Sequence, residues 1–286
     1  MIQQKSPEWY ELRKRKIGAS DAPVILGVSP FKTPYELWLE KMDFSQQPEN
    51  DAMRFGNEME PLVRERFYQE MQIPVIPQVC FHGEHTWLMA SLDGLSADGK
   101  TAVEIKCHRS PTDFNYVKDS GNVPEKYYPQ VQVQMEVLDL NRIFYMCFFD
   151  NDFHIIEVER DVDFIRDMIP KLRAFYECML HATPPPLLDK DKEHRSDNEW
   201  KNLVAQWLAI DEEITILKER QDMLRTSIIK AANGKSVEGA GIMLTKSVKR
   251  GSVDYSLIEE LKNMDLDKYR KESKEVWTIR KQKLEE

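Results

Sequence analysis

The stretch S-L-D-G-L-S-A-D-G-K-T-A-V-E-I-K-C, residues 91–107, predicts two neighbouring strands joined by a polar turn. We expect Asp93 to end the first strand, and Glu104 and Lys106 to lie on the second. Because side chains i and i+2 of a strand point to the same face, Glu104 and Lys106 project together. The turn can then bring Asp93 beside them.

This arrangement predicts a site for a hard divalent cation. Two carboxylates and the backbone carbonyl of Ile105 form an oxygen-rich set suited to Mg²⁺ or Mn²⁺. Such an ion polarises a phosphoryl oxygen and lowers the pKa of a bound water. Lys106 would hold the attacking water or help to deprotonate it.

The same residues have an ordinary explanation, a solvated hairpin. Asp93-Gly94 is also a turn signal, and E-I-K is a common triplet on exposed strands. The apolar residues around Glu104 argue against that explanation, because a strand covered on both sides buries its charges, and a buried charge needs a partner or a metal.

Two further segments carry polar groups that could serve the site. Glu60 lies on a predicted helix, residues 53–71, and could reach the water shell of a metal. Gln130 and Gln134 share one face of the helix led by Pro129, where their amides could orient the water, the lysine or a phosphate. Taken one at a time, these residues also fit exposed polar helix faces.

The rest of the first two thirds of the chain predicts an α/β (α+β) fold with a mixed central sheet flanked by helices. Predicted helices cover residues 7–14, a short segment capped by Ser20 or Asp21, 34–42, 53–71, the segment after Pro129, and 161–182. Predicted strands cover residues 75–82, 87–92, 101–107, 143–149 and 153–159.

Pro184-Pro185-Pro186 begins a predicted linker, residues 184–200, between a first domain (1–183) and an extension (201–286). In the extension, apolar residues alternate at spacings of four and three as in a heptad seam with one polar position. The seam is Leu203, Trp207, Ile210, Ile214, Leu217, Gln221, Leu224 and Ile228. It could pack on its own chain, on a sister subunit or on a partner protein.

Asn233-Gly234 should end this helix. A hairpin over 236–250, a helix over 255–263 capped by Asp254, and a last strand at 276–280 are expected after it.

Composition narrows the class of protein. There is no run of about 18 apolar residues and no signal-peptide pattern, so we expect no membrane span and no secretion. Four scattered cysteines without a C-x-x-C pair fit a reduced, intracellular protein. The net charge of −9 lies entirely in the first 195 residues and argues against a generic DNA-binding protein.

Taken in order, five segments resemble the lambda-exonuclease-like (YqaJ-type) viral recombinase nucleases of the PD-(D/E)xK superfamily, over roughly residues 7–180. They are W-Y-E-L-R (9–13) with G-A-S-D (18–21), F-G-N-E-M-E (55–60), S-L-D-G-L (91–95), E-I-K-C (104–107) and Y-Y-P-Q-V-Q-V-Q-M (127–135). The resemblance implies a restriction-endonuclease-like core and a Mg²⁺-dependent 5′→3′ exonuclease, with Mn²⁺ as a substitute. This activity would resect linear double-stranded DNA to 3′ overhangs for annealing.

The resemblance also implies an assembly and a setting. A single-strand annealing protein would be the partner, and the enzyme would be a homo-oligomer, a ring trimer around the duplex. It would be phage or prophage encoded and work in the cytoplasm of a bacterial host. Such nucleases need carboxylates at the metal, and positive charge only where phosphates lie, so the acidic balance does not exclude DNA.

The resemblance assigns roles to residues. Asp93, Glu104 and the Ile105 carbonyl would bind the metal, and Lys106 would act on the attacking water. Glu60 (possibly through water) and Gln130 would support these residues. A second group matches positions near the DNA and its terminal 5′-phosphate: Arg13, Ser20, Ser91, Arg109 and Tyr127.

The sequence departs from the family pattern at two other positions. Thr112 stands where the family has a basic residue, and Arg109 is near enough to substitute. Leu92 precedes Asp93 where a proline is common.

Two other activities stay open. The same fold could act as a structure-specific or single-strand endonuclease, or the chain could be a non-catalytic recombination scaffold. We interpret His82-x-x-His85 as a surface strand end rather than a zinc pair, because further ligands at zinc spacing are lacking. The cysteines fall within strand and helix patterns, so we expect no iron–sulfur cluster. Trp9 could stack on a DNA end or anchor the core.

Overall fold

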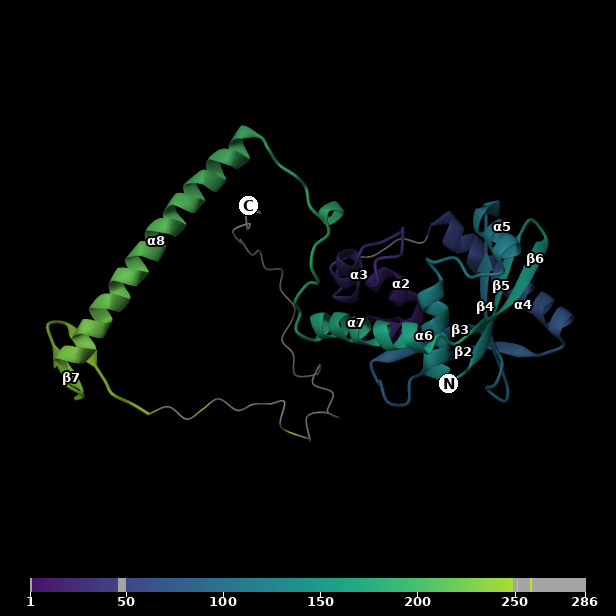
Figure 1. Cartoon of the computed structure of the whole chain (residues 1–286), viewed down its shortest axis with the longest axis horizontal. Coiled ribbons are helices and arrows are strands. Elements are labelled where there is room, and N and C mark those ends of the chain that lie inside the picture. Colours follow the sequence, from purple (N-terminus) through teal and green to yellow (C-terminus); the bar gives the residue numbers. More distant parts are fainter. Residues whose placement is uncertain (1, 46–49, 249–250, 252–257, 259–286) are drawn as a thin grey trace. The chain divides into compact units, whose positions relative to one another are not determined.

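The computed structural model describes residues 2–45, 50–248, 251 and 258. The chain divides into two compact units, residues 1–194 and 195–286 (Figure 1). The first unit holds the sheet and its helices, and the second is built on one long helix.

The helices of the first unit are α1 (Pro7–Arg15), a 3₁₀ turn (Ala19–Asp21), α2 (Ala22–Ile25), α3 (Pro34–Lys41), α4 (Asp51–Met71), α5 (Pro111–Ser120), α6 (Tyr128–Leu138), α7 (Val162–Leu180) and a second 3₁₀ turn (Asp189–Asp191). Its strands are β1 (Ile17–Gly18), β2 (Val75–Phe81), β3 (Leu88–Ser96), β4 (Ala102–Cys107), β5 (Arg142–Phe149) and β6 (Asp152–Glu159).

These strands form one mixed sheet in the order β1-β3-β4-β5-β6, with β2 also paired to β3. β4 and β5 run parallel, and β5 and β6 form an antiparallel hairpin. β2 pairs with β3 along most of its length, so β1 and β4 must share the opposite edge of β3. On that edge β1 pairs with Leu88 and Met89, and β4 pairs with Gly94 and Leu95. The part of β3 between these pairs has no strand partner on that edge, which leaves an opening in the sheet between β1 and β4.

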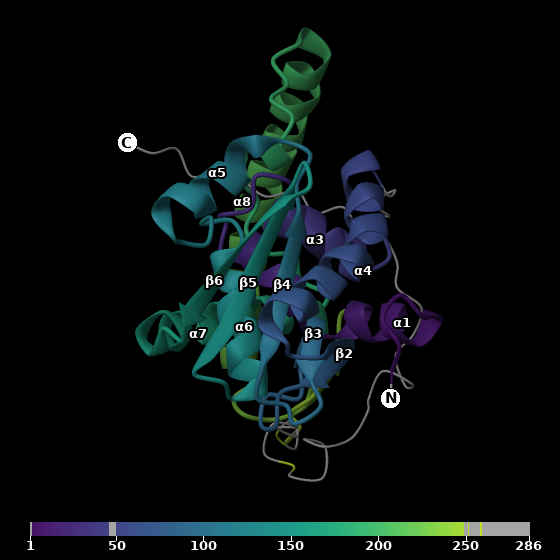
Figure 2. The ribbon, with the colours of Figure 1, turned by 90° about the vertical axis from the view of Figure 1, so that its right-hand side faces the viewer.

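Helices cover both faces of the sheet (Figure 2). On one face α4 packs Val63 and Phe67 against β4 and β5. On the other, α6 and α7 join a larger core in which Val131, Val133 and Leu172 are fully buried. A strand buried between two helical layers explains why β4 is apolar around its charged pair.

The fold class predicted from sequence is confirmed, and the element bounds mostly agree within two residues. Three details were wrong. Asp93 lies inside β3 rather than at its end, because Gly94 and Leu95 continue the pairing with β4. Helix α5 was not predicted. Neither Ser20 nor Asp21 caps α2 with its side chain, because the carboxylate of Asp21 instead accepts the backbone N–H of Gly18.

The second unit contains α8 (Asn198–Ala231) and a hairpin of β7 (Val237–Gly239) and β8 (Ile242–Leu244). Asn233 and Gly234 follow the helix in the left-handed conformation, as expected for a helix end. The predicted helix at 255–263 with its Asp254 cap, and the strand at 276–280, lie outside the described residues. Among the described helices, none is long and apolar enough to cross a membrane.

Candidate active site

Glu104 is the centre of a buried hydrogen-bond network between β4 and α6. Its side chain is about as buried as any in the chain, with 1% of the residue exposed. Oε1 accepts hydrogen bonds from Lys106 Nζ (2.5 Å) and Gln130 Nε2 (2.6 Å). Oε2 accepts one from Gln134 Nε2 (2.5 Å). Three donors therefore fix the orientation of one carboxylate.

Asp93 lies on β3 beside the opening in the sheet, and its side chain contacts the backbone of β4. Its Oδ2 accepts a hydrogen bond from the backbone N–H of Ile105 (2.7 Å). In a strand, the N–H and C=O of one residue point to the same neighbour. The Ile105 carbonyl therefore faces the side of Asp93, which brings together the three groups expected from the sequence.

The charges of the site favour the binding of a cation. Burial and the neighbouring carboxylates of Glu104 and Glu60 raise the pKa of Asp93 well above its ordinary value, although Lys106 opposes them. Two clustered acids in a poorly solvated place resist being charged together unless a cation joins them. The donor set is all oxygen, so these residues fit Mg²⁺ or Mn²⁺.

Lys106 is held as a cation. Burial alone would lower the pKa of its ammonium, but the charges of Glu104 and Asp93 outweigh burial and raise the pKa above its ordinary value. Nζ also lies 3.2 Å from Oε1 of Gln130 and 5.2 Å from the ring centroid of Tyr127. The side chain is thus oriented by an amide, a carboxylate and an aromatic face.

Helix α4 reaches the site through Glu60 and Arg64. Arg64 pairs with Glu60 (2.5 Å) and donates to the backbone carbonyl of Asp93 (2.6 Å). Arg64 was missed in the sequence, although its spacing of four from Glu60 on a helix is a signal that could have found it. It holds Glu60 beside β3 and fixes the backbone that carries Asp93.

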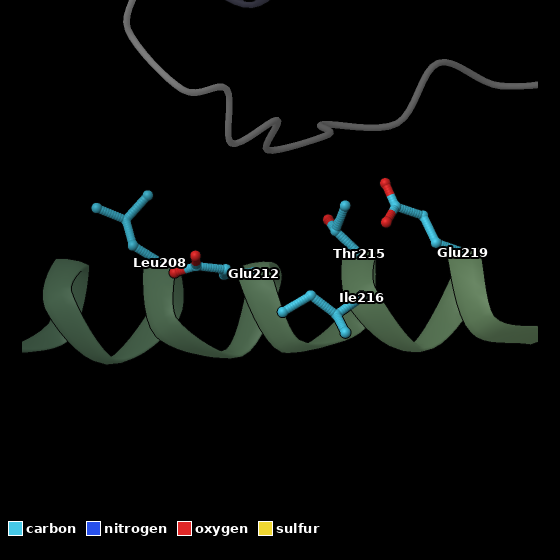
Figure 3. Close-up of a pocket in the computed structure, with 5 residues that line it drawn as sticks. All are labelled: Leu208, Glu212, Thr215, Ile216 and Glu219. Carbon is cyan, nitrogen blue, oxygen red and sulfur yellow. The ribbon is translucent and has the colours of Figure 1, made fainter.

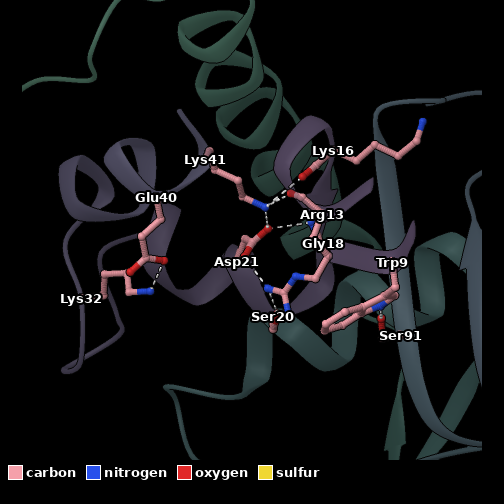
Figure 4. Close-up of polar contacts among 10 residues, drawn as sticks. All are labelled: Trp9, Arg13, Lys16, Gly18, Ser20, Asp21, Lys32, Glu40, Lys41 and Ser91. Atoms are coloured by element: carbon pink, nitrogen blue, oxygen red, sulfur yellow. Dashed lines mark hydrogen bonds and ion pairs between the residues drawn. The ribbon is translucent and has the colours of Figure 1, made fainter. Parts of the chain in front are cut away.

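A second set of polar contacts begins at Ser91 on β3 and joins the residues assigned to a terminal phosphate (Figure 4). The indole N–H of Trp9 donates to the hydroxyl of Ser91 (2.8 Å), and the guanidinium of Arg13 lies over the Trp9 ring at 5.0 Å. Arg13 also donates to the hydroxyl of Ser20 (3.0 Å). Ser91 lies two residues before Asp93 on β3, where the pairing with β2 is irregular.

Trp9 is therefore a buried anchor between these groups. Only 8% of the residue is exposed, so its ring is not offered to solvent as a stacking platform.

Behind Arg13 lies a buried ion pair that the sequence did not reveal. Lys41 Nζ contacts Asp21 Oδ2 at 2.5 Å, and Arg13 reaches the other oxygen of Asp21 at 3.0 Å. Burial raises the pKa of Asp21, but the charges of Lys41 and Arg13 outweigh it and hold the pKa below its ordinary value. Asp21 stays charged and holds Arg13 in place beside Ser20.

Arg109 stands apart from the other assigned residues. It is exposed, two positions after the end of β4, and the described residues make no hydrogen bond or ion pair with its side chain. The structure brings together the carboxylates, Lys106, Gln130, Glu60 and Tyr127, and separately Arg13, Ser20 and Ser91. Among the described residues, no contact joins the side chain of Arg109 to either group.

His82 and His85 do come close to Glu136, with ligand atoms within 4.8 Å of one another. Their geometry explains the cluster without a metal. Nδ1 of His82 accepts the backbone N–H groups of Glu84 and His85, so the neutral ring carries its proton on Nε2, toward Glu136. The two imidazoles are stacked, so their lone pairs do not converge on one point. Glu136 is also paired with Arg160.

Residues 8–141 match the family described as the YqaJ-like viral recombinase domain. This segment is therefore similar to the YqaJ-like viral recombinase domain. The family resemblance inferred from the five sequence segments is thereby confirmed. The chain is also 31% identical over 193 residues to the uncharacterized protein YqaJ of Bacillus subtilis (strain 168), with 64% of this chain and 59% of that protein covered. It thus spans less than two thirds of the relative's length.

The chain also resembles a solved structure, the alkaline exonuclease LHK-Exo from Laribacter hongkongensis. The TM-score is 0.55 at 25% identity, covering 62% of this chain and 94% of that one. The same values hold for LHK-Exo in complex with dAMP. The matched part of the chain therefore has a fold similar to that of an alkaline exonuclease.

Proposed function

We propose that this chain is a Mg²⁺-dependent exonuclease that digests linear double-stranded DNA from the 5′ end. The 3′ strand left behind would serve a single-strand annealing protein in phage-type recombination. The observation that carries the proposal is the buried Glu104, held by Lys106 and two glutamine amides, with Asp93 beside it. The likeness to an alkaline exonuclease supports the same activity.

Asp93, Glu104 and the Ile105 carbonyl would hold the metal, which when bound polarises the scissile phosphate and activates a water. Gln130 and Gln134 keep Glu104 in one orientation and leave its charge in place. Arg64 fixes the backbone of Asp93. These contacts limit the reorganisation that the site needs when the phosphate arrives.

Lys106 would hold the attacking water and offset the negative charge that develops on the phosphate. Its ammonium donates a hydrogen bond to Oε1 of Glu104 and places a positive charge beside the two carboxylates. Tyr127 and Gln130 aim the ammonium.

Arg13, Ser20 and Ser91 would receive the terminal 5′-phosphate. A guanidinium is well suited to a phosphate. That of Arg13 donates to the Ser20 hydroxyl and lies over the Trp9 ring, whose indole N–H donates to the Ser91 hydroxyl. An end-bound phosphate would place the first phosphodiester at the carboxylates and make the enzyme dependent on a DNA end. By the same family resemblance, three such domains would form a ring around the duplex.

The test uses the full chain with Mg²⁺ on five substrates. Four are linear duplexes, labelled at the 5′ or the 3′ end, each with and without a 5′-phosphate, and the fifth is a closed circle. We expect early release of the 5′ label as mononucleotide, faster digestion of phosphorylated ends, and an intact circle. Cutting of the circle would show an endonuclease. No release from any substrate would favour a non-catalytic scaffold.

A further inference from the structure

Helix α8 carries an apolar seam along one side and buries none of its residues among the part of the chain that the structure describes. Leu217 is 62% exposed and Leu203 is 57% exposed. A helix of 34 residues depends mainly on the packing of its apolar stripe for stability. The seam therefore needs a cover that the described residues do not supply.

The heptad spacing continues to both ends of the helix. Trp200 precedes the seam at the position of Trp207, and Ala231 follows it at the position of Leu224. Another face of α8 holds Leu208 and Ile216, but it also carries the carboxylates of Glu212 and Glu219, and all of its lining comes from this one helix (Figure 3). The seam, with Gln221 as its one polar member, is the more apolar face.

We propose that the seam is covered by α8 of a second copy of this chain, packed antiparallel, with Ile214 of one helix facing Leu217 of the other. This register sets Leu203 opposite Ile228 of the partner copy, so the whole seam is covered. The repeat of apolar residues at alternating spacings of four and three is that of a coiled coil.

The charges beside the seam favour this orientation. In the antiparallel register Asp211 lies level with Lys218 of the partner copy, and Glu213 lies level with Arg220. Each pair occurs twice because the two helices are identical. A parallel pair would instead set Glu213 against Lys218, but it would also set Arg220 against Arg225 twice, and like charges at these positions oppose pairing.

The sizes of the side chains favour it as well. An antiparallel pair sets Trp200 against the small Ala231, and Trp207 against Leu224. A parallel pair would set each indole against its own copy in two successive layers, which overfills one end and leaves the other empty. Its one gain would be a contact between the two copies of Gln221.

Disulfide cross-linking in the full chain tests both whether a second copy of α8 covers the seam and whether the two helices are antiparallel. Leu203→Cys and Ile228→Cys chains are oxidised separately and as an equal mixture, with the unmodified chain as the background for the native cysteines. We expect a band at twice the chain mass in the mixture and background levels in each variant alone. Cross-linking of each variant with itself would show a parallel pair. No cross-link in any sample would show that something else covers the seam, and either result overturns the proposal.

Charge exchange gives an independent readout that a ring of nuclease domains does not affect. Both cysteine chains are first given Asp211→Lys with Glu213→Lys, which sets like charges opposite Lys218 and Arg220 of the partner copy. We expect the cross-link yield to fall about 10-fold. In a second mixture, one cysteine chain keeps Asp211→Lys with Glu213→Lys, and the other carries Lys218→Glu with Arg220→Glu in their place. We expect this mixture to regain the cross-link yield. Failure to restore it, while digestion of duplex DNA stays normal in every variant, would contradict the assigned register.

Discussion

Gln134 donates its side-chain amide to Oε2 of Glu104 at 2.5 Å, on the oxygen that Lys106 does not reach. The helix and the strand thus share one carboxylate, and the glutamine holds it without touching the cation or the DNA that we propose for the site. Such outer partners of metal ligands contribute to both affinity and rate.

We therefore expect Gln134→Ala to lower the rate of digestion, or the affinity for Mg²⁺, about 10–100-fold. The measurement is the initial rate on a linear duplex over a Mg²⁺ titration. Gln69→Ala, an exposed glutamine on α4, is the matched control and should behave as the unmodified chain. A rate equal to that of the unmodified chain at every Mg²⁺ concentration would contradict the assigned role of Gln134.

Arg13→Ala should remove the preference for a 5′-phosphate. Charge-assisted hydrogen bonds contribute about 1.5–3 kcal/mol, so we expect digestion of phosphorylated ends to slow about 10–100-fold. Ends with a 5′-hydroxyl should be affected little. Arg15→Ala, an exposed arginine on the same helix, is the control. Equal losses on both kinds of end would show that Arg13 does not bind the phosphate.

The buried pair of Asp21 and Lys41 should matter for stability. Asp21→Asn leaves the ammonium of Lys41 buried with only carbonyl partners, at a cost of about 3–5 kcal/mol. Urea unfolding of the single variants and of Asp21→Asn with Lys41→Met measures this. The double variant should recover part of the loss, and additive losses would argue against direct coupling.

The same pair gives a pH dependence. Because the folded pKa of Asp21 is lowered, its contribution is present above its ordinary value of 3.8 and is lost as pH falls through the folded pKa. Between pH 5 and pH 2 the unmodified chain should therefore lose more stability than Asp21→Asn. Parallel pH profiles would exclude a lowered pKa at this carboxyl.

Gly94 should resist substitution because β3 is tightly packed there. A Cβ on Gly94 would lie 2.6 Å from Val75 Cγ2 and 2.7 Å from Val103 Cγ1. We expect Gly94→Ala to destabilise the chain by about 1–3 kcal/mol in urea unfolding, with partial rescue by Val75→Ala. Gly83→Ala, where a Cβ meets nothing within 4 Å, is the control and should be near neutral.

The packing at Gly94 also shows where sequence reasoning stopped. Asp-Gly was interpreted as the end of a strand, but here the glycine lets β2 and β4 approach β3, so the strand continues. Local sequence cannot distinguish a turn glycine from one required by close packing. The pairing of Glu104 with Lys106 was predictable because it needs only the period of a strand.

Contacts between distant segments were the hardest to predict. Asp21 was expected to cap a helix, and its true partner, Lys41, is 20 positions away. The link from Trp9 to Ser91 spans 82 positions and has no local pattern. Gln130 and Gln134 were found because both lie on one helix face, although nothing local placed that face against Glu104.

The most direct test of the metal site is the release of mononucleotides from a 5′-phosphorylated linear duplex by the purified full chain and its Asp93→Asn variant, in Mg²⁺ and after chelation. A metal stabilises the transition state by several kcal/mol, so we expect the variant and the chelated enzyme to lose at least about 100-fold in rate. Circular dichroism and urea unfolding should show that the variant is folded. Digestion by folded Asp93→Asn at the rate of the unmodified chain would contradict the assignment of this carboxylate to the catalytic metal.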